Sequence, residues 1–113
     1  MNFNLFNISV IILLLFMHGT SLAAVKREEV HINIQNHLFE PAEIKVAAGV
    51  VLKIIIHNLD NTVEEFESFD LKREKIVPAQ GKVAVSVGPL KPGTYKFFGE
   101  FHQETAQGII LVK

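Results

Sequence analysis

The sequence predicts an all-β domain, an antiparallel sandwich or barrel, on three observations. Apolar and polar residues alternate with period two in several stretches, as at Val30, Ile32 and Ile34, which have polar residues between them. Turn-forming Gly, Pro, Asn and Asp residues separate short apolar stretches at close spacing. Beyond residue 24, no long stretch keeps the period of an amphipathic helix.

About seven strands are expected from this pattern. In chain order they are residues 30–35, 42–46, 50–57, 64–69, 83–87, 94–98 and 108–112. Residues 36–41 are expected to be irregular. Residues 71–80 are ambiguous. A short helical turn at 71–74 is one interpretation, and the turn residues Pro78 and Gly81 follow it.

The core is expected to come from the apolar third strand, residues 50–57, and from the next strand, residues 64–69. Val50, Leu52, Ile54 and Ile56 fall on one face of the third strand, and Phe66 points inward from the next. A chain of 113 residues suits one domain with one core. Because the sequence has no Cys, the domain must hold together without disulfides, through a well-packed core or with help from a bound metal.

Residues 1–24 are predicted to be a signal peptide, which leaves a mature domain at 25–113. A predominantly apolar stretch at 8–17 is followed by the small residues Ala23 and Ala24, and it is too short to span a bilayer comfortably. The segment carries no Lys or Arg. The expected consequence is export from the cytoplasm.

Composition excludes several classes of function. The net charge is −1, and Lys and Arg are interleaved with Asp and Glu, so no basic surface for nucleic acid is expected. The chain has no Cys nucleophile, no Gly-x-Ser-x-Gly motif, no phosphate-binding glycine loop and no Cys-x-x-Cys metal motif. No catalytic residue is therefore predicted.

Metal ligation by His and carboxylate remains. Residues 64–67, Glu-Glu-Phe-Glu, place three carboxylates at the start of a strand, and residues 99–108 place His102 between the last two strands. Crowded carboxylates repel one another unless they are solvated or share a cation. A metal site and a solvated charged strand are both open interpretations of this pattern.

Several motifs resemble those of small cupredoxins. They are Phe39-x-Pro41, Ile44-x-Val46, Gly49, a long apolar strand ending in Asn58, and Leu90-x-Pro92-Gly93-x-Tyr95. The resemblance covers residues 30–113. It implies a Greek-key β-sandwich of cupredoxin-like fold.

Three longer motifs resemble a narrower group, the cupredoxin-like periplasmic proteins that accompany bacterial ferrous-iron uptake permeases. They are Asn-His-x-Phe-x-Pro at 36–41, Glu-Glu-Phe-Glu-Ser at 64–68, and Gly-Glu-Phe-His-x-x-Thr-Ala-x-Gly at 99–108. This resemblance implies a periplasmic protein of iron transport. Its implied partners are an inner-membrane iron permease and other periplasmic uptake components, and its mature domain does not span the membrane.

The ligands of blue-copper proteins are largely absent. By the resemblance, their first His falls on Glu64, their Cys-x-x-His pair falls on Gly99 and His102, and their Met falls around 105–107. Only His102 keeps its identity. The chain has no Cys, and both of its methionines lie in the predicted signal peptide, so a blue-copper electron carrier is excluded by its need for a thiolate.

A site with harder ligands is expected in its place. The resemblance places the loop before Phe39 at the same end of the sandwich as the ligand loops, which brings His37 near Glu64 and His102. A register error of one residue would exchange Glu64 and Glu65, so both are kept as candidates. Nitrogen and oxygen ligands of this kind suit iron, Cu(II), Mn or Zn, and a copper or iron ion is the expected cofactor.

The predicted function is a periplasmic metal-binding accessory protein of iron transport. Two alternatives stay open. One is a ferroxidase that oxidises Fe(II) for uptake. The other is a metal-free protein-interaction module that uses an apolar end containing Leu38 and Phe101.

Overall fold

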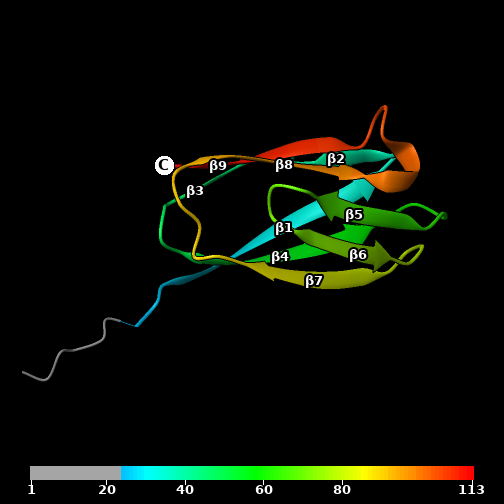
Figure 1. Ribbon diagram of the computed structural model, residues 1–113. Helices are drawn as coiled ribbons and strands as arrows, with labels where there is room; N and C mark the ends of the chain where they lie inside the picture. Colours follow the sequence, from blue (N-terminus) through cyan, green and yellow to red (C-terminus); the bar gives the residue numbers. More distant parts are fainter. Residues whose placement is uncertain (1–23) are drawn as a thin grey trace, which may run out of the picture.

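The computed structural model describes residues 24–113, which form two β-sheets packed as a sandwich (Figure 1). One sheet has four strands in the order β2-β1-β4-β7, and the other has five in the order β3-β9-β8-β5-β6. The elements are β1 (Arg27–Gln35), β2 (Leu38–Glu40), β3 (Glu43–Val46), β4 (Val51–Asn58), β5 (Glu64–Ser68), β6 (Arg73–Val77), β7 (Lys82–Val87), β8 (Gly93–Gly99), the 3-10 turn η1 (Glu100–His102) and β9 (Gln107–Val112). The predicted signal peptide lies almost wholly outside the described residues.

The seven expected strands are confirmed, and two further strands were not expected. β2 lies within residues 36–41, where it pairs antiparallel with β1. β6 begins at Arg73, so the helical turn expected at 71–74 is wrong. β6 is an edge strand in which only Val77 is buried, and its remaining residues therefore show no alternation of apolar and polar side chains.

The expectation of purely antiparallel sheets is wrong for two pairs of strands. β1 pairs parallel with β4, and β3 pairs parallel with β9. After the β1–β2 hairpin, the chain crosses to the other sheet for β3 and returns as β4 beside β1. Parallel neighbours require such a crossover, because a tight hairpin can only join antiparallel strands.

The core lies between the sheets and contains the expected residues. Val50, Leu52, Ile54, Ile56 and Phe66 are all buried. Burying a side chain of this size contributes about 1.5–3 kcal/mol to folding. The aromatic part of the core consists of three rings, those of Phe39, Phe66 and Phe97, whose centroids lie 5.0–6.3 Å apart.

These three rings support one end of the sandwich. Each lies two residues from a position at that end, namely His37, Glu64 and Gly99. Phe66 and Phe97 share the strand faces of Glu64 and Gly99, because side chains two apart in a strand point to the same side. The end of β1, the start of β5 and η1 meet there (Figure 1). Among the described residues, no helix has the length and apolar character needed to cross a membrane.

Candidate metal centre

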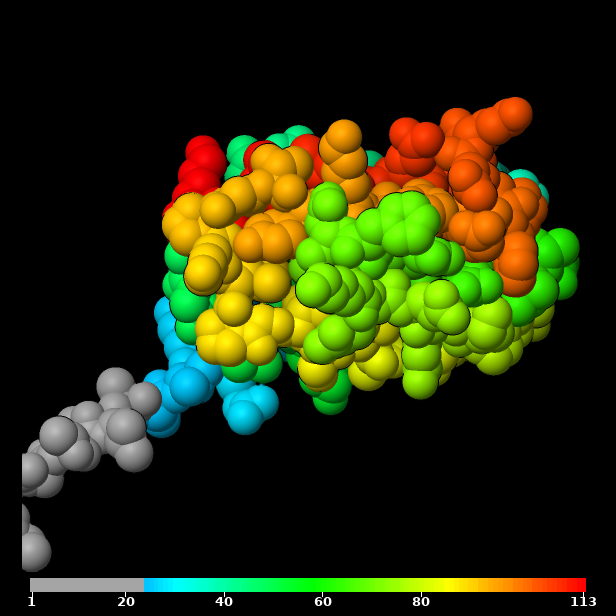
Figure 2. Space-filling view, in the orientation of Figure 1, coloured from blue at the N-terminus to red at the C-terminus, as the bar shows by residue number. Residues whose placement is uncertain are grey.

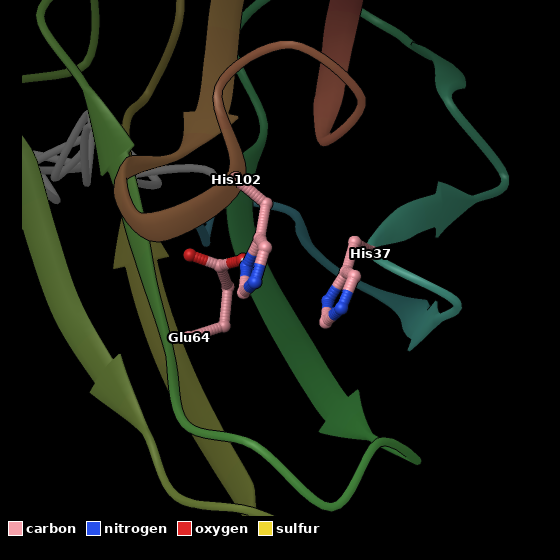
Figure 3. A group of neighbouring side chains, drawn as sticks. All are labelled: His37, Glu64 and His102. Atoms are coloured by element: carbon pink, nitrogen blue, oxygen red, sulfur yellow. The ribbon is translucent and has the colours of Figure 1, made fainter.

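Three side chains from separate segments converge at this end of the sandwich. His37 comes from the β1–β2 turn, Glu64 is the first residue of β5, and His102 is the last residue of η1. Each can offer one ligand atom such that the three atoms lie within 4.8 Å of one another. Figure 3 shows the Glu64 carboxylate directed toward the His102 ring, with the His37 ring beside it.

Glu64 is buried, and both of its carboxylate oxygens have hydrogen-bond partners. Its Oε1 atom accepts the backbone N–H groups of Glu65 at 3.0 Å and Phe101 at 2.9 Å. Its Oε2 atom lies 2.6 Å from Nδ1 of His102. An ionised carboxylate can only accept, so an ionised Glu64 takes a proton from Nδ1 of His102, and a neutral His102 ring then has its lone pair on Nε2.

His37 lies in an unusual turn. The two residues between the paired positions Gln35 and Leu38 are Asn36 and His37, with φ angles of 53° and 58°. Two successive positive φ angles are characteristic of a type I′ hairpin turn, which usually contains Asn and Gly. For a histidine this left-handed conformation is unfavourable without outside support.

Asp60 supplies that support from the loop after β4. Its Oδ1 accepts the N–H of Asn36 at 2.8 Å, and its Oδ2 accepts the N–H of His37 at 2.9 Å. The same Oδ2 lies 3.4 Å from Nδ1 of the His37 ring. Burial raises the pKa of Asp60. The two backbone donors and the nearby imidazoles together lower it by more, so the pKa lies below the ordinary value.

The candidate residues predicted from the sequence do not include Asp60. A usable signal was present, because Asn36 separates two stretches that can form a two-residue hairpin. The parallel pairing of β1 with β4, which places Ile34 beside Asn58, then brings the β1–β2 turn close to Asp60. That pairing was not expected from the sequence.

The two imidazole rings are stacked. The centroids of His37 and His102 lie 3.5 Å apart, and the ring planes differ by 9°. A metal–nitrogen bond of about 2.0 Å lies close to the plane of its imidazole. A single ion cannot lie in both of these parallel planes, so at least one ring must rotate before both histidines bind the same ion.

The donor set fits a divalent ion that prefers nitrogen and oxygen. Each histidine has its Nδ1 facing a carboxylate, Glu64 for His102 and Asp60 for His37. Metal-binding histidines commonly use one ring nitrogen as ligand while the other faces a carboxylate that orients the ring. Two carboxylates, Glu64 and Asp60, also place negative charge beside a bound divalent ion.

Glu65 lies apart from the other three candidates. Successive residues of a strand face opposite sides, so Glu65 points outward and lies near Glu67 and Glu74, with ligand atoms within 4.8 Å of one another. Partial burial and the neighbouring carboxylates raise the pKa of both Glu65 and Glu67. The β5–β6 segment that carries this acidic cluster covers much of the face shown in Figure 2.

By the resemblance to cupredoxins, Gly99 stands at the position expected for the blue-copper Cys. A Cβ atom placed there would lie 2.6 Å from Cδ of Glu64 and 2.7 Å from Cβ of Ala106. The Glu64 carboxyl group therefore fills the space that a side chain at position 99 would need. In this structure, the buried glutamate and a cysteine at position 99 exclude each other.

Comparison with known proteins identifies relatives of this chain. A family model described as a cupredoxin-like domain matches residues 7–112. An uncharacterized protein of Rickettsia prowazekii is 51% identical over 84 residues, which cover 74% of this chain and 67% of the relative.

Solved structures of the same fold include copper proteins. The metal-binding domain of the Cu(I)-exporting P-type ATPase CopA of Streptococcus pneumoniae D39, solved with Cu(I), has a TM-score of 0.66 at 16% identity, covering 77% of this chain and 86% of that one. Auracyanin A, a "blue" copper protein of Chloroflexus aurantiacus, has a TM-score of 0.68 at 15% identity, covering 78% of this chain and 100% of that one. A purple cupredoxin of Nitrosopumilus maritimus has a TM-score of 0.60 at 15% identity, covering 74% of this chain and 99% of that one.

Proposed function

The chain belongs to the cupredoxin-like domain family, and we propose that it is a periplasmic metal-binding accessory protein of iron transport. The observation that carries the proposal is the pair of histidines, His37 and His102, each with Nδ1 facing a carboxylate. This arrangement leaves Nε2 of each ring as a metal ligand. We propose that the ion is copper or iron.

The ligand chemistry supports Cu(II) or iron over Cu(I). Cu(I) prefers soft sulfur ligands, and the sequence has no Cys and no Met beyond residue 17. The copper named for CopA and auracyanin A supports copper as one choice of metal. In this proposal Glu64 orients His102 and is available as a further oxygen ligand, because Oε2 retains a second lone pair.

The cellular context of the proposal comes from the sequence. The predicted signal peptide at 1–24 supports export. The three motifs that resemble those of periplasmic components of ferrous-iron uptake support a role beside an inner-membrane iron permease. Co-purification of the permease with the tagged protein from solubilised membranes tests this part. Absence of the permease from the eluate would contradict it.

Metal titration of the purified protein tests the site. We expect Cu(II) or iron to bind in a one-to-one complex, and His37→Ala or His102→Ala to weaken binding by at least about 100-fold. His57→Ala is the matched control, because His57 is an exposed residue of β4 that faces away from the core. No binding of either metal, or full affinity in both site variants, would overturn the proposal. Oxygen consumption by the copper-loaded protein with Fe(II) tests the ferroxidase alternative.

A second candidate, binding of a partner protein, is favoured by the apolar residues at this end. Leu38, Leu59, Val63 and Phe101 are each 40–50% exposed. Each is the sequence neighbour of a residue at the centre, namely His37, Asp60, Glu64 and His102 respectively. Capture of the permease that persists in the presence of a chelator would favour this candidate, and capture that requires metal would favour the metal-binding function.

A further inference from the structure

The carboxylate of Asp60 is directed entirely at the His37 turn. It accepts two consecutive backbone N–H groups, and within residues 24–113 its ion-pair contact is with the His37 ring. Its own backbone is fixed on both sides: the N–H donates to Oδ1 of the buried Asn58 at 3.0 Å, and the carbonyl accepts the N–H of Gln80 at 3.0 Å. A charged group held this firmly can fix the conformation of the segment that it contacts.

The His37 turn needs such a partner. A non-glycine residue with positive φ persists only where the surrounding structure stabilises it. Asp60 stabilises both left-handed residues at once, because its two oxygens each bind one of their amides. In an extended or right-handed turn, the side chain of His37 would leave the position where it stacks on His102.

From these contacts we infer that Asp60 is a positioning residue of the metal centre, which holds the His37 turn beside His102 and favours Nε2 as the ligand nitrogen of His37. The inference rests on the proposed function. Asp60 acts in two ways, through the backbone of the turn and through the ring. At 3.4 Å from Nδ1, the carboxylate oxygen repels a lone pair and favours a proton on that nitrogen.

The tautomer of His37 tests the inference without any metal. Nitrogen-15 NMR of the metal-free protein at a pH where His37 is neutral is expected to show the proton on Nδ1 in the wild type. In Asp60→Asn, we expect a substantial fraction of His37 to carry the proton on Nε2 instead. An unchanged tautomer in this variant would overturn the role of Asp60 at the ring.

Affinity for Cu(II) tests the consequence for the centre. Asp60→Asn and Asp60→Ala are expected to lower the affinity about 10- to 100-fold and to weaken the nitrogen hyperfine signal of one imidazole in the EPR spectrum. Asp70→Asn is the matched control, because Asp70 likewise accepts a backbone N–H, that of Lys96 at 2.8 Å, but lies outside the centre. This control is expected to keep full affinity.

A double variant separates positioning from loss of folding. Asn36→Gly removes the cost of one left-handed residue, so adding it to Asp60→Ala is expected to recover stability but not Cu(II) affinity. Full affinity in folded Asp60→Ala would overturn the inference while the proposed function stood. If the wild type bound neither copper nor iron, the proposed function would fail, and the NMR experiment would still decide the role of Asp60.

Discussion

Nδ1 of His102 lies 2.6 Å from Oε2 of Glu64, a carboxylate that is only 1% exposed. A buried charge is costly unless it is paired and hydrogen-bonded. Here the cost is offset by three donors, the His102 ring and the backbone N–H groups of Glu65 and Phe101. The contact ties η1 to the start of β5 and makes the centre part of the folded structure before any ion binds.

Removing the Glu64 carboxylate is therefore expected to destabilise the fold. Glu64→Ala leaves three donors without an acceptor and opens a cavity beside Gly99. We expect the free energy of unfolding to fall by about 3 kcal/mol or more, measured by urea denaturation.

Glu65→Ala provides the control for this experiment. Glu65 is the next residue of the same strand, but its side chain faces outward, and its backbone N–H to Glu64 is retained in the variant. We expect a change within about 0.5 kcal/mol. Equal destabilisation by the two variants would contradict the role given to the buried carboxylate.

The parts of the fold that the sequence predicts are those in which burial imposes a pattern. β1 and β7 alternate because one face packs on the core, and β4 is an apolar stretch in which Ile54, Ile55 and Ile56 are all buried. The existence of these three strands can therefore be predicted from the residues. β6 could not be predicted in this way, because burial imposes no pattern on an edge strand with four exposed residues. β2 is only three residues long, which is too short to show a period.

Three residues of the metal centre could be predicted from the sequence, and one could not. The motifs singled out His37, Glu64 and His102, and the structure brings these three together. The choice between Glu64 and Glu65 needed the strand register, which decides the side to which each side chain points. The position of Asp60 beside the His37 turn depends on the parallel pairing of β1 with β4. This is a long-range contact that no local sequence pattern predicts.

Binding of one ion by both histidines is expected to separate the stacked rings. The ring protons of His37 and His102 lie within each other's ring current at a centroid distance of 3.5 Å. On addition of Zn(II), which is diamagnetic and accepts imidazole ligands, we expect the proton NMR signals of both rings to move downfield. The signals of His31 and His57, both exposed on strands, are expected to stay in place. Movement of one site histidine alone would mean that the two do not share the ion.

The acidic cluster on β5 and β6 is expected to make stability depend on pH. Glu67 lies directly opposite Glu74 in the strand register, and its pKa is raised from the ordinary value of 4.5 by partial burial and by the carboxylates of Glu100, Glu74 and Glu65. The folded state therefore binds the proton of Glu67 more tightly than the unfolded state does. The resulting stability is fully present below about pH 4.5 and is lost as the pH rises through the raised pKa.

Glu67→Gln removes this dependence. We expect the variant to be more stable than the wild type at about pH 7, with a smaller gain at about pH 4 and in high salt, by urea denaturation. Glu104→Gln, which alters an exposed carboxylate in the loop before β9, serves as control and is expected to change little. A gain for Glu67→Gln that is the same at both pH values would rule out charge repulsion as its cause.

Gly99 and Glu64 compete for the same space, so enlarging Gly99 is expected to damage the centre. The Cβ of Gly99→Ala would lie 2.8 Å from Oε2 of Glu64, the oxygen that contacts His102. Relief of this overlap must move the carboxylate, so we expect a loss of about 1–3 kcal/mol in stability together with weaker Cu(II) binding. Gly108→Ala is the matched control, because its Cβ would meet the ring of Phe97 in the core. That variant is expected to lose stability but to keep its affinity for Cu(II) while folded. Wild-type Cu(II) affinity in folded Gly99→Ala would show that the position of Glu64 does not matter for binding.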